Sequence, residues 1–365
     1  MATLADNVYQ AITDFDDIRS AIIEKDQPVP AGTPTSAYAN KIRDIKTSVI
    51  GWQPDTLWVK MPNMPVAGQQ VIYAIVGVTE NYPYMALMAT TLSGQYRVDW
   101  GDGTVTTHNS STMASRTYSF ASLASDKTQD GFKTVLITIT AVTAGNLRTL
   151  DFGYSLALDM RSGKTNYLFY VRGRALSLTR ITFTGSGSTW SHSRFLKCVD
   201  LLDTASLTSS NAMLSYAASL CCVPQLDMSF VTNADYMFAQ AFGLYTAPPL
   251  NTVRCASFVG MFSECEALVN IPTPLNLGAA TNITDMFEEC VALQNVRFSA
   301  ISPAITNLNL AKTALSRQAI VNVFNDLPAR SSGTQVINIT QCPGAAQLTT
   351  QDRQIATNKR WTITS

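Results

Sequence analysis

Hydrophobic residues recur with a fixed period in the second half of the chain. Four segments each carry a Met followed seven residues later by a Leu, and successive segments are 24, 24 and 25 residues apart. The pairs are Met213 and Leu220, Met237 and Leu244, Met261 and Leu268, and Met286 and Leu293. A unit of this length cannot bury its apolar face alone, whereas stacked copies can. The repeat therefore predicts a solenoid over residues 154–310, with these eight residues in its core.

Within each repeat, the apolar positions first follow the period of a helix. In Asn282–Val291 they fall at i, i+3, i+4 and i+7, which is one face of a short helix. Polar residues before each such stretch, for example Thr232 and Asn233, are candidate helix caps. The Leu-x-x-Val segment that follows is typical of a short strand. The pattern thus predicts one helix and one strand per coil, an α/β solenoid.

The last part of the chain, residues 311–365, leaves the repeat. Its pattern predicts a helix over residues 315–328, a strand at 337–339, a turn, and then a short helix and a last strand over 355–365. Such a segment is suited to covering the final coil.

Residues 51–153 instead alternate between apolar and polar positions. Val71–Val76, Tyr96–Trp100 and Lys133–Thr140 show this period of two and predict strands. Asp102 and Gly103, flanked by β-prone residues, predict a hairpin turn because glycine tolerates positive φ. A β-sandwich of about 100 residues is expected.

The first 50 residues predict a helical attachment or oligomerisation segment with a Pro-rich linker at residues 27–34. Apolar residues spaced by 4, 3, 4, 3 and 4 positions form the candidate interface: Leu4, Val8, Ala11, Phe15, Ile18 and Ile22. This spacing is that of a coiled-coil seam, although a helix packed on its own chain explains it equally well.

Three stretches resemble known families. The Met-Phe-x-x-Cys-x-x-Leu core at residues 261–268 and 286–293 resembles BspA-type leucine-rich repeats, which occur in bacterial surface proteins, mycoplasma lipoproteins and phage tail proteins. The run Asp99–Val105, followed by Tyr118, resembles the immunoglobulin-like PKD fold. The N-terminal arrangement resembles that of some phage tail and fibre proteins. Together they imply a multidomain α+β protein with a helical segment, a PKD-like sandwich and a leucine-rich-repeat-like α/β solenoid.

The resemblance implies a phage virion structural protein, of tail-fibre or baseplate type, assembled in the host cytoplasm. Its partners would be other virion proteins, bound through the N-terminal segment of a homo-oligomer, and a host-surface glycan or protein. Two alternatives stay open: a bacterial cell-surface adhesin of the BspA type, and a glycan-degrading tailspike.

Composition narrows the function further. The 365 residues include 26 Lys and Arg and 26 Asp and Glu, so the formal net charge is zero. Nucleic-acid binders normally carry a basic excess that neutralises phosphates, so no nucleic-acid partner is expected. No stretch approaches 18 apolar residues and the N-terminus lacks a secretory pattern, so neither membrane insertion nor export is expected. The seven cysteines include no Cys-x-x-Cys pair, which favours small buried thiols over a zinc site or a disulfide framework.

Candidate chemistry is sparse, so we expect no enzyme activity and no cofactor. The two histidines, His108 and His192, are interpreted as isolated loop residues without a nucleophile or metal partners. Asp99 and Asp102 are weak calcium candidates, because two carboxylates are too few ligands and an aspartate-stabilised turn explains them. Other groups considered are the solenoid glutamates, a small arginine cluster and an aromatic group at the start of the solenoid. They are Glu264, Glu266, Glu288 and Glu289; Arg172, Arg174 and Arg180; and Tyr154, Tyr167, Phe169, Tyr170, Trp190 and Phe195.

Overall fold

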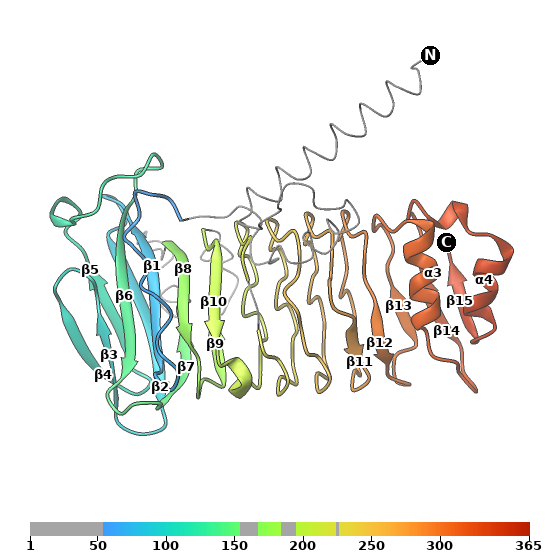
Figure 1. Cartoon of the computed structure of the whole chain (residues 1–365), viewed down its shortest axis with the longest axis horizontal. Helices are drawn as coiled ribbons and strands as arrows, with labels where there is room; N and C mark the ends of the chain where they lie inside the picture. The colour runs from blue at the N-terminus through green and yellow to red at the C-terminus, as the bar shows by residue number, and fades with distance from the viewer. Residues whose placement is uncertain (1–53, 154–166, 184–194, 224–225) are drawn as a thin grey trace, which may run out of the picture. The chain divides into compact units, whose positions relative to one another are not determined.

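The computed structural model describes residues 54–153, 167–183, 195–223 and 226–365. Residues 52–365 form one compact unit of the chain. The predicted N-terminal helical segment, its six apolar interface residues and the Pro-rich linker lie outside the described residues. Figure 1 labels the elements.

The described strands and helices are, in chain order, as follows. The first part contains β1 (Val71–Val78), β2 (Tyr84–Thr91), β3 (Gln95–Asp99), β4 (Val105–Asn109), β5 (Met113–Thr117), the 3-10 turn Phe120–Ser122, β6 (Lys133–Ala141), β7 (Leu147–Asp151), β8 (Tyr167–Arg174), β9 (Arg180–Thr182), β10 (Cys198–Leu202) and the 3-10 turn Thr204–Ser206. The second part contains β11 (Leu275–Leu277), β12 (Phe298–Ile301), β13 (Asn307–Asn309), α3 (Arg317–Asp326), β14 (Gln335–Asn338), the 3-10 turn Ala345–Gln347, α4 (Thr350–Thr357) and β15 (Trp361–Thr364).

Two β-sheets share one core in the first part. One has the strand order β10-β8-β1-β6-β3-β4 and the other the order β5-β2-β7-β9. Apolar side chains from both sheets, such as Ile72, Leu87 and Ile137, are fully buried in the common core. The predicted strands are confirmed as β1, β3 and β6. The predicted hairpin is also confirmed, because β3 and β4 pair antiparallel on either side of the Asp-Gly turn.

Both sheets continue into the solenoid. On the six-stranded sheet, β8 pairs with β1 and then accepts β10 in parallel, and Cys198 of β10 bridges to Cys222 of the next coil. On the four-stranded sheet, β9 pairs in parallel with β7, and Thr208 of the next coil donates its N–H to Thr179 just before β9. Two faces of the solenoid therefore extend the two sheets (Figure 1). The domain boundary predicted at residue 153 stays a prediction. Both sheets pair strands that precede this residue with strands that follow it.

The stretches predicted to be helices are successive turns. Alternate amides donate to the neighbouring coil instead of to the carbonyl four residues back: Gly260 N–H to Thr284 O at 2.9 Å, Phe262 N–H to Met286 O at 3.0 Å and Glu264 N–H to Glu288 O at 2.7 Å. The amides between them close i→i−3 turns, as Met261 does with the carbonyl of Phe258. No amide is left for a helical ladder, so the helix prediction for the repeats is wrong.

Two residues in each turn segment have the left-handed backbone. One precedes the Met of each repeat, and the other follows it by three residues. The first column is Ala212, Tyr236, Gly260 and Asp285, with φ of 51°, 54°, 54° and 55°. The second is Tyr216, Gln240, Glu264 and Glu289, with φ of 57°, 59°, 57° and 53°. These positions interrupt any right-handed helix, and they aim every second amide at the next coil.

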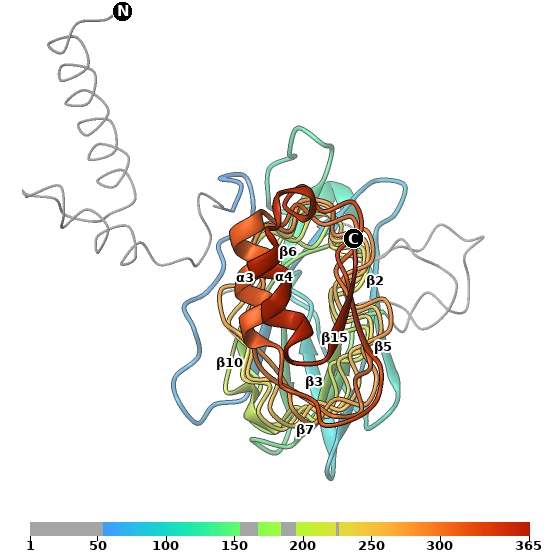
Figure 2. The ribbon, with the colours of Figure 1, turned by 90° about the vertical axis from the view of Figure 1, so that its right-hand side faces the viewer.

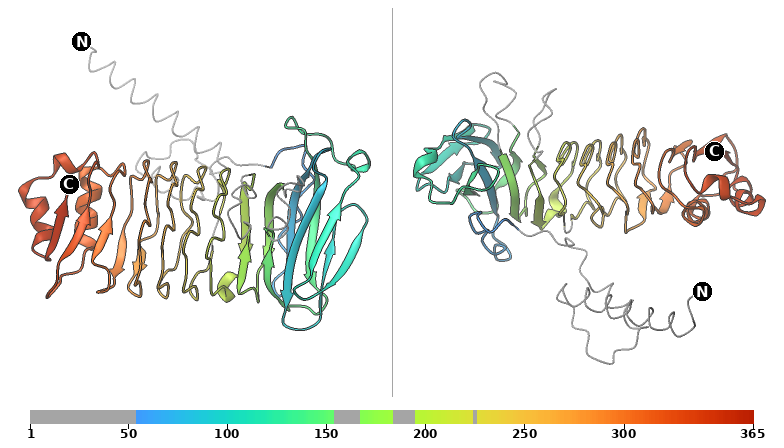
Figure 3. Two further views of the ribbon diagram at one scale, coloured as in Figure 1. Left: turned by 180° about the vertical axis from the view of Figure 1, so that it is seen from behind. Right: turned by 90° about the horizontal axis from the view of Figure 1, so that it is seen from above.

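The interior of the coils is a stack of equivalent side chains. All eight Met and Leu residues of the repeat are buried. Between them Phe238, Phe262 and Phe287 stack nearly parallel, with ring centroids 5.4 Å and 5.9 Å apart. The thiols of Cys265 and Cys290 each donate to the carbonyl of a phenylalanine in the preceding coil, Phe238 and Phe262, at 3.0 Å. The same apolar side chains therefore recur in each coil, and the coils are stacked one after another (Figure 3).

The closing segment has the elements predicted for it. A helix, a strand, a short helix and a last strand occur as α3, β14, α4 and β15. Strands β13, β14 and β15 form a parallel sheet at the end of the stack. Ser316 caps α3, and Thr349 and Asp352 form a capping box at α4. Figure 2 views the two helices beside this end of the coils.

The predicted fold class is wrong. The structure is mostly β, and the α-helices of the described residues, α3 and α4, both lie in the closing segment. It does not fit a leucine-rich-repeat-like α/β solenoid, in which every coil would contribute a helix. The coils consist of turns and short parallel bridges, so the observed element is a β-solenoid continuous with a two-sheet domain.

Candidate functional site

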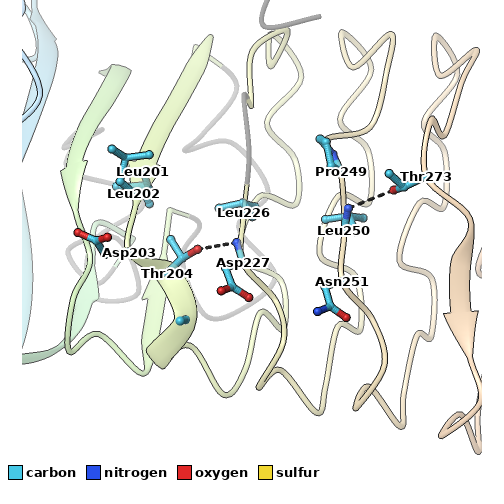
Figure 4. Close-up of a pocket in the computed structure, with 11 residues that line it drawn as sticks. Leu201, Leu202, Asp203, Thr204, Leu226, Asp227, Pro249, Leu250, Asn251 and Thr273 are labelled. Atoms are coloured by element: carbon cyan, nitrogen blue, oxygen red, sulfur yellow. Dashed lines mark hydrogen bonds between the residues drawn. The ribbon is translucent and has the colours of Figure 1, made fainter.

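A groove of about 640 Å³ runs across several coils on one side of the solenoid. It is lined by equivalent positions of successive coils, drawn in Figure 4: Leu201, Leu202, Asp203, Thr204 and Ala205, then Leu226 and Asp227, then Pro249, Leu250 and Asn251, then Thr273. Leu202, Leu226 and Leu250 are 24 residues apart, and so are Asp203, Asp227 and Asn251.

Backbone pairing between coils is sparse along the groove, where Leu226 and Leu250 form an isolated parallel bridge. Pro249 has no N–H to donate. Side-chain hydroxyls replace carbonyl acceptors, with Asp227 N–H donating to Thr204 Oγ1 at 2.6 Å and Leu250 N–H to Thr273 Oγ1 at 3.2 Å (Figure 4). Two threonine hydroxyls therefore add to the backbone contacts between coils along this strip.

The charges of the groove are largely structural. The Asp203 carboxylate accepts from Arg174 at 2.6 Å, and the Asp227 carboxylate accepts the N–H of Ser229 at 2.9 Å. Nothing in this set pairs a base with a nucleophile. The groove can offer hydrogen-bond acceptors and hydroxyls to a polar ligand, but it contains no arrangement for general acid or base chemistry.

A second concavity, of about 650 Å³, lies where the first domain meets the first coils and is lined by aromatic rings. Trp58 stacks on Phe169 with centroids 4.9 Å apart, and Phe132 meets Phe169 and Phe195 edge to face. Gly77 of β1 makes room for them, because a Cβ there would lie 2.7 Å from the Phe169 ring. The polar residues of its lining are Asp55, Thr128, Asp130, Lys197 and Ser219.

This aromatic recess combines residues that the sequence grouped with residues that it did not. Tyr167, Phe169 and Phe195 were predicted to gather, and they do so around Phe132. Trp58 and Phe132 were missed, because they lie far away in the sequence and reach the site only through the sheet. Tyr170 instead contacts the Arg172 guanidinium, and Tyr154 and Trp190 lie outside the described residues.

The calcium candidates are engaged in the hairpin turn. Asp99 accepts the N–H of Gly101, and Asp102 accepts the N–H of Thr104 and an ion pair from Arg116 at 2.7 Å. Burial acts to raise the pKa of Asp102, but the hydrogen bonds from Arg116 and Thr104 outweigh it and leave the pKa below its usual value. Over the described ranges, no group of three or more His, Cys, Asp or Glu residues could hold a metal ion.

Structural partners engage His108, Arg172 and Arg174, whereas Arg180 is exposed. His108 lies in strand β4, not in a loop as predicted, where it stacks on Tyr96, and burial lowers its pKa. Arg172 and Arg174 bind Asp200 and Asp203, respectively, at 2.9 and 2.6 Å. His192 lies outside the described residues.

The solenoid glutamates lie on turns instead of the predicted helices. Glu264 accepts from Gln240 at 3.0 Å, and Glu289 accepts an ion pair from Lys312 at 2.5 Å. Glu266 and Glu288 are exposed.

The cysteines depart from the prediction of small buried thiols at two places. Cys198 and Cys222 form a disulfide between adjacent coils, with their Cα atoms 4.4 Å apart. Cys221 is an exposed thiol, and Cys255, Cys265, Cys290 and Cys342 are buried thiols. The prediction of small buried thiols is therefore wrong for the bonded pair and for the exposed Cys221.

Searches among protein-family models, curated proteins and solved structures find no match to this chain. Within the part of the chain that the structure describes, no helix is both long and apolar enough to cross a bilayer.

Proposed function

We propose that the protein is a non-enzymatic structural component of a phage virion, of tail-fibre or baseplate type. It attaches through its N-terminal segment and presents the solenoid to a host surface. The resemblance of the sequence to phage proteins supports a place in a virion. The fold, which presents repeated surface positions on a rigid stack, supports a binding role without catalysis.

One observation carries the recognition role. The same turn segment is repeated coil after coil, and its left-handed positions carry side chains as different as Ala212, Tyr236 and Asp285 on the same backbone. The backbone hydrogen bonds between coils do not depend on these side chains, so the side chains can vary without loss of the fold. Such positions are suited to presenting a variable binding surface to a partner. Both sheets of the first domain support the ladder, so the displayed positions sit on a stiff body.

The experiment compares phage particles assembled with the full chain and with a chain lacking residues 1–45. We expect mass spectrometry of gradient-purified particles to find the full chain and to find the shortened chain depleted by at least tenfold. A variant with Tyr245→Ala, far from the N-terminus, serves as the matched control and should be incorporated normally.

Two results would contradict the proposal. If the full chain is absent from purified particles and fractionates with the bacterial envelope, it is an adhesin. If purified chain releases sugars from host envelopes, the passive role is wrong.

A further inference from the structure

The aromatic side chain of Tyr236 packs only in part on the solenoid and is otherwise exposed. Its side chain is 48% exposed, although its backbone has φ of 54°. Bulky residues are rarely found with this backbone, because the left-handed conformation brings Cβ close to the following carbonyl. Equivalent positions in neighbouring coils carry Ala212, Gly260 and Asp285 instead. A bulky ring in a costly conformation that buries only about half of its surface points to a role outside folding.

The neighbouring coil is shaped to receive this ring. A Cβ on Gly260 would lie 2.6 Å from Cε1 and 2.7 Å from Cδ1 of Tyr236. The tyrosine ring therefore occupies the place that a side chain at Gly260 would fill, and it spans two coils. Any larger residue at this position of the column would push the ring away from the surface.

Polar groups flank the ring in the second left-handed column. Gln240 Nε2 donates to Glu264 Oε1 at 3.0 Å, which links the same two coils that the ring spans. The two cross-coil contacts lie four residues apart on the same pair of coils, Tyr236 against Gly260 and Gln240 with Glu264. Tyr216 occupies the position of Gln240 in the preceding coil, and after burial the charges of Glu264 and Tyr236 raise its pKa.

We propose that Tyr236, with Gln240, Glu264 and Tyr216, binds a neutral pyranose sugar. A pyranose has an apolar C–H face about the size of one aromatic ring and a rim of hydroxyls that need both donors and acceptors. The negative face of an aromatic ring attracts the C–H groups, and the amide and carboxylate serve the hydroxyls. Glu264 is the charged member of the set, so an acidic sugar is disfavoured. This inference rests on the proposed recognition role and names its ligand.

The test titrates the full chain with methyl glycosides of galactose, glucose, mannose and N-acetylglucosamine, and with methyl glucuronide, using saturation-transfer NMR. At least one neutral glycoside should receive saturation from the protein, and the glucuronide should receive at least tenfold less. Tyr236→Ala should weaken binding by tenfold or more, and Tyr236→Trp should retain it. Gly260→Ala should also weaken binding, because the ring is displaced.

Two control variants separate this site from general effects. Tyr245→Ala removes another exposed ring, and Asp285→Ala changes the same column one coil beyond Gly260. Both should bind like the parent chain, and thermal unfolding should show that every variant is folded.

The proposal is overturned if no neutral glycoside binds, or if Tyr236→Ala binds as well as the parent chain. It is also overturned if Tyr236→Ala abolishes attachment to host cells while no glycoside binds, since the ligand is then a protein. The two proposals can fail separately. A chain that binds no sugar can still be incorporated into particles, and a chain that is absent from particles can still bind sugar.

Discussion

The phenylalanine column shows what a single residue contributes to the stack. Phe262 is fully buried between Phe238 and Phe287. Phe262→Ala should lower the free energy of unfolding by about 3–5 kcal/mol, because it opens a cavity and removes two ring contacts. Urea denaturation measures this. Phe242→Ala, at a ring that is 38% exposed, should cost much less. Equal losses in the two variants would show that the column does not form the core.

The cysteines give a countable prediction. The disulfide between Cys198 and Cys222 leaves five of the seven cysteines as thiols. In native protein we expect Ellman's reagent to label the exposed Cys221 alone, since the other thiols are buried and burial raises the pKa of Cys290 to about 12 and that of Cys265 well above its usual value. Five thiols should react after denaturation without reductant. Seven would show that the disulfide does not form.

Asp102 makes the hairpin sensitive to acid. Its pKa is below the usual value in the folded protein, so its ion pair with Arg116 stabilises the fold fully above the unfolded pKa of about 3.9. That contribution is lost as the pH falls through the lower folded pKa. Asp102→Asn should therefore melt below the parent chain at pH 6, and calorimetry should find the difference shrinking at pH 2. A difference that does not change with pH would exclude the ion pair as its source.

At the residue scale, the sequence alone was sufficient to find the interior but not the surface partners. Period and spacing identified Met213, Leu220 and their equivalents, all of which are buried. The ion pairs of Asp102 and Arg174 were not foreseen. Each joins residues that only the fold brings together, so no local pattern marks them.

The repeated turn segment was misread as a helix for a physical reason. Turns that close every three residues return apolar side chains to the interior at spacings of three and four, as Met261, Cys265 and Leu268 do. A helix gives the same spacing. The two structures differ in where the amides donate, and side-chain periodicity does not report this.

Glycine substitution distinguishes a turn from a helix. Ala212 has φ of 51°, so Ala212→Gly removes the left-handed penalty and should raise the free energy of unfolding by about 1 kcal/mol. The same change in a helix would lower it by about 1 kcal/mol. Ala218→Gly in the same coil, outside the left-handed columns, is the control and should be destabilising. Denaturant midpoints give the sign, and a loss of stability in the Ala212 variant would favour the helix.

At the scale of the whole molecule, the first domain and the solenoid share their sheets. Strand β8 pairs with β1 on one side and with β10 on the other. A chain cut at residue 153 would expose the pairing edge of β1 and the apolar end of the coils at once. We expect fragments 54–153 and 195–365 each to aggregate or to give poorly dispersed NMR spectra. A well-folded fragment 54–153 would show that the first domain is independent.

The sequence predicted a strand-rich region, a repeated region and a closing segment. It did not predict that the first two regions share continuous sheets. Alternation in residues 71–76 and 133–140 and the period of 24 residues each marked a region correctly as strands or as coils. The connection between the regions depends on β8, β9 and β10. Strand β8 pairs with β1, and β9 pairs with β7. Both partners lie outside the repeated region, so the period of 24 residues does not mark these connections.

The two left-handed columns have an evolutionary consequence. The backbone keeps the same conformation whether a position in the first column is alanine, tyrosine, glycine or aspartate. A single substitution there therefore changes the outer surface without changing the fold. Under the proposed recognition role, such substitutions would change which ligand the surface binds without changing the fold. Variation among related chains should accordingly concentrate in these columns and spare the methionines beside them.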